Sequence, residues 1–256
     1  QWGLDFINAS DAYSYGASGK GVVVGVVDEA LDWGHHEFLK ENILHPDSIL
    51  MYSGNREPTP LEKFHGTATS SIIAGRKDNE PVDRNMHGVA YDAQILFIAI
   101  ELGSPPSDGE YEPIDIPAFS WERFDEQEAK FYEELSSKSD VINNSFGFTG
   151  QITDYSKETL QNTFPKLINT FSSQQETIFV WSAGNYNGIT DTEGEQVNAA
   201  NPGILAGLGY YFPELAKNNV AVVAVDQEGK IADFSNRCGV AADFCIAAPG
   251  VQVPLA

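Results

Sequence analysis

Three polar side chains in this sequence are of the types that acid–base chemistry uses: an aspartate, a histidine and an asparagine. Asp28 and Asn185 each follow a short apolar run, and His65 opens a stretch of small and apolar residues. A carboxylate can orient an imidazole and stabilise its cationic form, and a side-chain amide can donate a hydrogen bond to a developing oxyanion. If the fold brings these three residues together, their side chains predict a site that transfers protons and stabilises a developing negative charge.

The stretch after His65 predicts a helix buried in the core. Ala68, Ile72, Ile73 and Ala74 recur at helical spacing, with small residues between them. We therefore expect His65 in the first turn of this helix, with its ring at the helix end, where loops and clefts lie. Because helix N-termini disfavour an added positive charge, an imidazolium there needs a carboxylate partner.

The elements that must position these residues alternate between strands and helices. Strands are predicted at residues 22–27, 94–100, 141–145, 178–181, 220–225 and 244–247. Several of them are apolar throughout, which is typical of parallel strands buried on both faces. Helical patterns occupy residues 121–138 and 156–174, and Pro165 predicts a kink or a break in the second. The expected fold class is α/β, an open and mostly parallel sheet with helices on both faces.

Sheets of this kind place their sites beyond the carboxyl ends of the strands. Asp28, Ser145 and Asn185 each end a different predicted strand. We therefore expect these three residues at one edge of the sheet, with His65 beside them.

Two further segments are predicted near the N-terminus. Residues 5–17 form a short amphipathic segment with Ile7, Ala9, Ala12 and Tyr13 facing inward, and residues 29–62 form a long loop. The glycines at positions 16, 19 and 21 precede the first strand. A dinucleotide-binding loop carries its glycines after the strand, so that function is excluded for them.

The length and net charge of the chain limit the number of domains and the kinds of binding partner that we expect. A chain of 256 residues can bury one large core, and one domain over residues 1–256 is expected. The net charge of −22, from 15 basic and 37 acidic residues, argues against binding nucleic acid. Solubility and salt tolerance are its ordinary consequences. Part of the charge is local, because residues 101–134 hold 11 acidic and 2 basic side chains.

Other sequence features bear on the compartment. No apolar run is long enough to span a membrane. The chain begins at Gln1 without a basic and apolar leader, so in an exported protein the signal peptide has already been removed. Cys238 and Cys245 are too far apart for a metal knuckle, and their even count favours one local disulfide over two free buried thiols. A disulfide indicates an oxidising compartment.

Five segments, in this order along the chain, resemble the subtilisin-like serine proteases, or subtilases. They are Gly19–Asp28, His65-Gly66-Thr67, Val141–Gly147, Ala183-Gly184-Asn185 and Ala247–Gly250. The block from Phe234 to Gly250 is most similar to passenger proteases of Gram-negative autotransporters. The resemblance implies a subtilisin-like three-layer sandwich that is truncated before the segment of the nucleophile, so that residues 1–256 are a catalytic domain incomplete at its C-terminal end.

The resemblance also implies roles for the quoted residues. Asp28 would orient His65, the general base and then acid, and Asn185 would donate to the oxyanion. The substrate would bind along a set of residues that also line the first specificity pocket: Ser145, Phe146, Gly147, Ala183 and Gly184. The alternatives are structural: a turn-capping aspartate, a locally satisfied histidine, a left-handed turn asparagine and an ordinary strand end.

Three departures from the family pattern stand out. Glu29-Ala30 replaces the usual small hydroxyl residue and glycine, and a second acid beside Asp28 would raise the proton affinity of the catalytic carboxyl. His35-His36-Glu37 is expected to be a solvated loop rather than a metal site, although Glu37 and Gln1 could contribute to a structural calcium site. The chain stops six residues after Gly250, and none of its serines stands in the family's Gly-Thr-Ser segment.

The function expected from the resemblance is that of a secreted serine endopeptidase whose nucleophilic serine lies outside this chain. The alternative is an inactive pseudoprotease that binds peptides. No cofactor is required, and the expected partners are a peptide or protein substrate, the remaining C-terminal segment and an outer-membrane translocator domain. The expected location is secreted or at the cell surface, on a Gram-negative outer membrane.

Overall fold

A single parallel sheet organises the computed structural model, which describes residues 1–44, 60–77, 86–100, 120–190 and 194–254. Its seven strands follow the order β2-β3-β1-β4-β5-β6-β7, and every neighbouring pair is parallel. The strands are β1 (Val23–Asp28), β2 (Ile43–Leu44), β3 (Gln94–Ala99), β4 (Val141–Asn144), β5 (Ile178–Ser182), β6 (Asn219–Val225) and β7 (Cys245–Pro249). The predicted α/β class and its six strands are confirmed.

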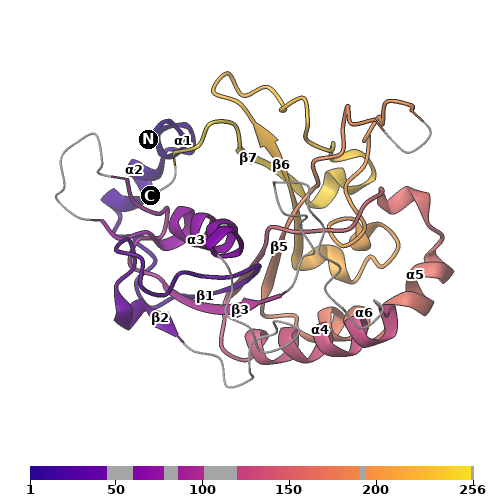
Figure 1. The fold of residues 1–256 in the computed structure, drawn as a ribbon, viewed down its shortest axis with the longest axis horizontal. Coiled ribbons are helices and arrows are strands. Elements are labelled where there is room, and N and C mark those ends of the chain that lie inside the picture. The colour runs from indigo at the N-terminus through magenta and orange to yellow at the C-terminus, as the bar shows by residue number, and fades with distance from the viewer. Residues whose placement is uncertain (45–59, 78–85, 101–119, 191–193, 255–256) are drawn as a thin grey trace.

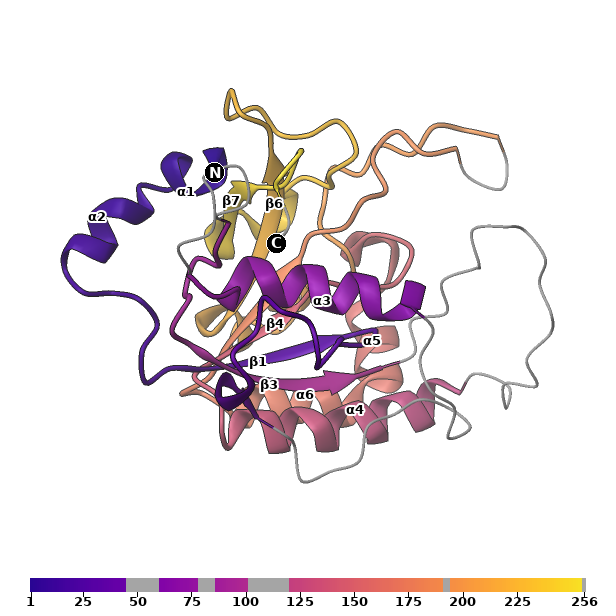
Figure 2. The same cartoon turned by 60° about the vertical axis from the view of Figure 1, so that its left-hand side comes forward.

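Helices cover both faces of this sheet (Figures 1 and 2). The helix α3 (Pro60–Ala74) lies over β1 and β3, while α4 (Trp121–Ser136), α5 (Lys157–Thr163) and α6 (Pro165–Ser173) lie on the opposite side. Shorter elements are α1 (Trp2–Phe6), α2 (Ala9–Ser14) and the 3₁₀ turns Lys40–Asn42, Ile152–Asp154, Leu208–Tyr210, Leu215–Lys217 and Gly239–Phe244. In the described part of the chain, no helix is both long and apolar enough to cross a membrane.

Strand β1 shows why an uninterrupted apolar run suits the middle of the sheet. Val24 and Val26 belong to the core under α3, whereas Val27 belongs to the core under α4 and α6. The register sets Asp28 opposite Ala99 of β3 and Val27 opposite Asn144 of β4. Because the strands are parallel, the residues after Asp28 and Asn144 leave the sheet at the same edge.

The predicted break at Pro165 is present. Helix α5 ends at Thr163 and α6 begins at Pro165, where the missing N–H of proline costs no helical hydrogen bond. The buried Asp125 of α4 accepts hydrogen bonds from the N–H groups of Lys166 and Leu167 at 3.0 and 2.9 Å. The carboxylate therefore caps the N-terminus of α6, and its negative charge interacts favourably with the positive end of the helix dipole.

Two predictions near the N-terminus are wrong. The segment 5–17 is two helices separated by Asn8, whose φ of 53° is left-handed, and the side chain of Ile7 is exposed rather than inward. The predicted loop 29–62 contains β2 and the start of α3. Strand β2 has only two residues, too few for a periodic signal. The rest of that loop and nearly all of the acidic segment 101–120 lie outside the described residues.

Candidate active site

The carboxylate of Asp28 is fully buried at the end of β1 and is surrounded by donors. Its Oδ1 atom accepts the N–H of Glu29 at 2.7 Å and lies 2.6 Å from Nδ1 of His65. Its Oδ2 atom lies 2.9 Å from the hydroxyl of Thr69. Hydrogen bonds to a carboxylate are stronger than neutral ones, so these three donors hold the Asp28 side chain in a fixed orientation.

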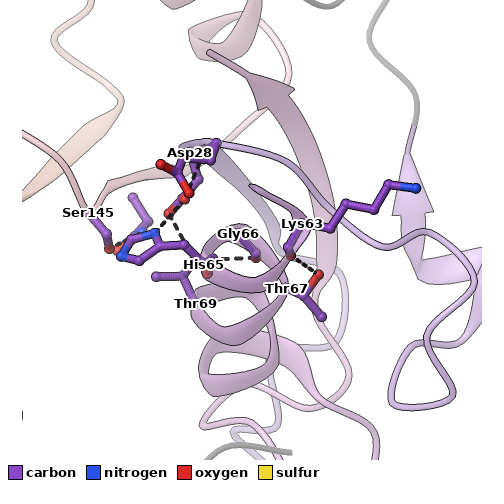
Figure 3. A network of polar contacts seen from close by, with 9 residues as sticks. Asp28, Lys63, His65, Gly66, Thr67, Thr69 and Ser145 are labelled. Atoms are coloured by element: carbon purple, nitrogen blue, oxygen red, sulfur yellow. Dashed lines mark hydrogen bonds and ion pairs between the residues drawn. The ribbon is translucent and has the colours of Figure 1, made fainter. Parts of the chain in front are cut away.

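His65 lies in the second turn of α3, not in the first as predicted. The helix begins at Pro60, a residue favoured at the first helical position, but Pro60 falls among the prolines and glycines that predict a loop. The side chain is 47% exposed, so the ring is open to solvent while Nδ1 faces Asp28 (Figure 3). The hydrogen bond to Asp28 raises the pKa of His65, as do the charges of Asp28 and Glu29, while burial opposes them.

The residues after His65 explain why the helix sits so close to the end of β1. A Cβ atom at Gly66 would clash with the backbone of Ala30 and the ring of Phe97. The hydroxyl of Thr67 accepts the N–H of Asp32 at 2.9 Å and donates to the carbonyl of Lys63 at 2.5 Å. Glycine permits the approach, and threonine fixes the loop after Asp28 to the helix.

Asn185 lies in a loop after β5 that a second asparagine holds in place. Gly184 has a φ of 112°, which favours glycine, whereas Asn185 does not have the left-handed backbone that its structural alternative requires. The buried Asn236 donates its backbone N–H to the carbonyl of Gly184, accepts the N–H of Tyr186 and donates its amide to the carbonyl of Asn201. Nothing in the sequence marks Asn236 for this role, because an isolated asparagine carries no periodic signal.

Two hollows open beside these residues. The loop hollow, of about 190 Å³, is lined by Ser145–Phe148, Ser182–Tyr186 and Gly203–Ala206. The strand hollow, of about 260 Å³, is lined by Asn143, Ser145, Val180–Asn185, Val222–Ala224, Ser235 and Ala248–Gly250. Ser145 and Asn185 line both hollows. The structure thus brings the predicted substrate residues Ser145, Phe146, Gly147, Ala183 and Gly184 together in the loop hollow.

The remaining candidate positions are the two cysteines and the residues considered for a metal ion. Cys238 and Cys245 form a disulfide, as predicted. Among the described residues, no cluster of three histidine, cysteine, aspartate or glutamate side chains is arranged for a metal ion. Glu37 is largely buried next to His36, and the side chain of Gln1 forms hydrogen bonds with the backbone of His87. The calcium site at Glu37 and Gln1 stays a prediction.

A model of the subtilase family matches residues 19–255. The chain belongs to this family. It is 25% identical to an extracellular serine protease of Serratia marcescens over 99% of this chain and 24% of that protein. It is 27% identical to serotype-specific antigen 1 of Mannheimia haemolytica over 95% of this chain and 31% of that protein. The chain therefore spans no more than about a third of these relatives.

Solved structures carry the same fold. MycP1 from Mycobacterium smegmatis superposes with a TM-score of 0.64 at 21% identity, over 97% of this chain and 62% of that one. The prenylagaramide maturation protease PagA superposes with a TM-score of 0.58 at 19% identity, over 97% of this chain and 70% of that one. The subtilisin-like fold is therefore confirmed.

Proposed function

We propose that residues 1–256 are the larger part of the catalytic domain of a serine endopeptidase, completed by a serine from outside these residues. The observation that carries the proposal is the buried carboxylate of Asp28, 2.6 Å from Nδ1 of a half-exposed His65. With Nδ1 held by the carboxylate, Nε2 of His65 can take a proton from a hydroxyl and later return it to a leaving amine.

Each remaining step of peptide hydrolysis has a group in this site. The deprotonated hydroxyl attacks the peptide carbonyl, and the amide of Asn185 donates to the oxygen that becomes negative. His65 protonates the leaving amine, and the acyl-enzyme is then hydrolysed by water, activated by the same base. Asp28 keeps its hydrogen bond to Nδ1 and stabilises the imidazolium.

The strand hollow is where the completing segment would fit. Residues of β5, β6 and β7 line it, together with Ser145 and Asn185. A segment seated there can reach the open side of His65. The loop hollow would receive the substrate side chain before the cut, and no charged residue of the described chain lines it.

Export to the cell exterior is also part of this proposal. It is supported by the similarity to an extracellular protease and to a serotype-specific antigen and by the disulfide, which is typical of oxidising compartments. Under this proposal the substrate is a peptide or protein, and a translocator domain at the outer membrane is the partner in export.

A fluorophosphonate probe tests the reaction directly. The protein that contains residues 1–256 together with its native flanking sequence should be labelled, and mass spectrometry should place the label outside residues 1–256. His65→Ala should abolish labelling, because the hydroxyl loses its base, while His36→Ala, an exposed histidine beside Glu37, should be labelled as the parent is. A folded protein that resists the probe would instead be the peptide-binding pseudoprotease.

A further inference from the structure

Thr69 lies one helical turn after His65 on α3, and its hydroxyl oxygen is 2.9 Å from Oδ2 of Asp28. Figure 3 shows the threonine on the same helix as His65, beneath the carboxylate. In the sequence this position is only one of the small residues of a buried helix. Its contact with the carboxylate depends on the packing of α3 against the end of β1.

The hydrogen bonds of Asp28 show what this hydroxyl contributes. The Glu29 N–H and the His65 ring both meet Oδ1. Within the described part of the chain, Thr69 is the donor to Oδ2. Because Asp28 is fully buried, an unpaired carboxylate oxygen would be costly.

The single proton of the hydroxyl has more than one acceptor nearby. Thr69 Oγ1 also lies 2.8 Å from the carbonyl oxygen of His65 and 3.3 Å from that of Gly66. In an α-helix the carbonyl of His65 already accepts the N–H of Thr69. A charge-assisted bond to a carboxylate is also about twice as strong as a neutral one. The proton therefore favours Asp28.

We propose that Thr69 is a positioning residue, whose hydroxyl fixes the rotation of the Asp28 carboxylate so that Oδ1 faces Nδ1 of His65. The residue after Asp28 is Glu29, which brings a second negative charge rather than a hydroxyl to this end of β1. Thr69 supplies a hydroxyl from the same helix as His65, so α3 carries both side chains that contact the Asp28 carboxylate. The effect of Thr69 on catalysis rests on the proposed function, whereas its hydrogen bond to Asp28 does not.

The pKa of His65 in the folded protein reports this role without catalysis. Without the tie the carboxylate of Asp28 can rotate and the contact with Nδ1 loosens, so Thr69→Val should lower the pKa of His65 by about half a unit. Thr69→Ser keeps the hydroxyl and should restore the parental pKa. NMR titration of the imidazole measures both variants, with the His65 signal assigned by its loss in His65→Gln.

Thr67→Val is the matched control, because it also removes a threonine hydroxyl from α3. This hydroxyl bonds the backbone of Asp32 and Lys63 and does not contact Asp28. Thr67→Val can lower stability but should leave the pKa of His65 in place. An unchanged His65 pKa in Thr69→Val, or an equal shift in Thr67→Val, would overturn the proposal. If Thr69→Val does not fold, Thr69→Ala, a good helix former, takes its place under the same criteria.

On the completed enzyme, Thr69→Val should lower kcat/KM about tenfold through kcat, and Thr69→Ser should recover most of it. A loss confined to KM would contradict a positioning role. A shifted pKa in a protein that the fluorophosphonate probe does not label would retain Thr69 as a positioning residue and reject the protease. A labelled protein with an unshifted pKa would retain the protease and reject the role of Thr69.

Discussion

The pairing of Asp28 with His65 is decided by a few atoms around one carboxylate. Asp28 has three donors although it is fully buried, and His65 stays half-exposed, so one partner is fixed and the other can exchange protons with a substrate. Glu29 adds a second negative charge within reach of the imidazole, which helps to raise the pKa of His65. The departure at position 29 therefore alters the acidity of the base and leaves the pairing intact.

Removing the charge of Glu29 should widen the active pH range. The general base must be neutral, so activity falls on the acid side as His65 is protonated. Glu29→Gln removes a charge that favours the imidazolium, and the acid limb of kcat/KM against pH should move down by roughly 0.2–0.5 unit for a partly exposed pair. The shift should shrink in high salt, and the control Glu41→Gln should show none. A shift to higher pH would contradict this effect of the charge.

At the scale of elements, regular patterns are predictable from the sequence and close contacts are not. Strand β1 and the break at Pro165 follow from burial on both faces and from the geometry of proline. The first turn of α3 has no such signal, because Pro60 lies in a stretch without periodicity. The roles of Thr69 and Asn236 depend on contacts between distant segments, which local patterns do not encode.

Helix α4 buries a glutamate within its apolar stripe, one turn after Phe124 and one turn before Tyr132. This residue is Glu128, and its Oε2 has no hydrogen-bond partner in the described part of the chain. Burial raises the pKa of Glu128 to about 8 from an ordinary value of 4.5. The charged form is therefore disfavoured in the folded protein near neutral pH.

This burial predicts how stability depends on pH. Below about pH 4.5 the carboxyl is protonated in both folded and unfolded chains and costs nothing; above that value the unfolded chain ionises first, so stability falls up to about pH 8. Glu128→Gln should remove a decline of at most about 1.4 kcal/mol per pH unit. Denaturant unfolding at pH 5, 6.5 and 8 measures the difference, which should grow with pH. The exposed Glu122→Gln is the control, and an equal gain at every pH would contradict the mechanism.

At the scale of the whole molecule, the fold does not account for the large excess of acidic over basic residues. The net charge of −22 belongs to the whole chain, yet the segment 101–119, outside the described residues, holds Asp108, Glu110, Glu112 and Asp115 without a basic side chain. This segment follows β3 along the chain, and from the resemblance to the subtilases we expect it to border the substrate. Carboxylates there would attract cationic stretches of a substrate.

We therefore expect faster cleavage of peptides that carry lysine before the cut. Lysine and glutamine should be compared by kcat/KM at each position on that side. At the positions farther from the cut than the residue in the loop hollow, the lysine peptides should be several-fold faster at low salt. Exposed charges are screened over about 8–10 Å at physiological salt, so the advantage should shrink as salt rises. At the residue that enters the loop hollow, whose described lining is uncharged, lysine should gain nothing.

A pair of variants separates this segment from the overall field. Changing Asp108, Glu110, Glu112 and Asp115 to their amides should abolish the lysine preference. The control changes four exposed glutamates elsewhere to glutamine: Glu158, Glu176, Glu214 and Glu228. Both proteins lose the same charge, so only the first should lose the preference if the segment lies along the cleft. Equal losses in the two variants would assign the attraction to the net charge of the protein. Equal rates for lysine and glutamine peptides in the parent would reject the attraction altogether, because a cleft lined by carboxylates must discriminate between them at low salt.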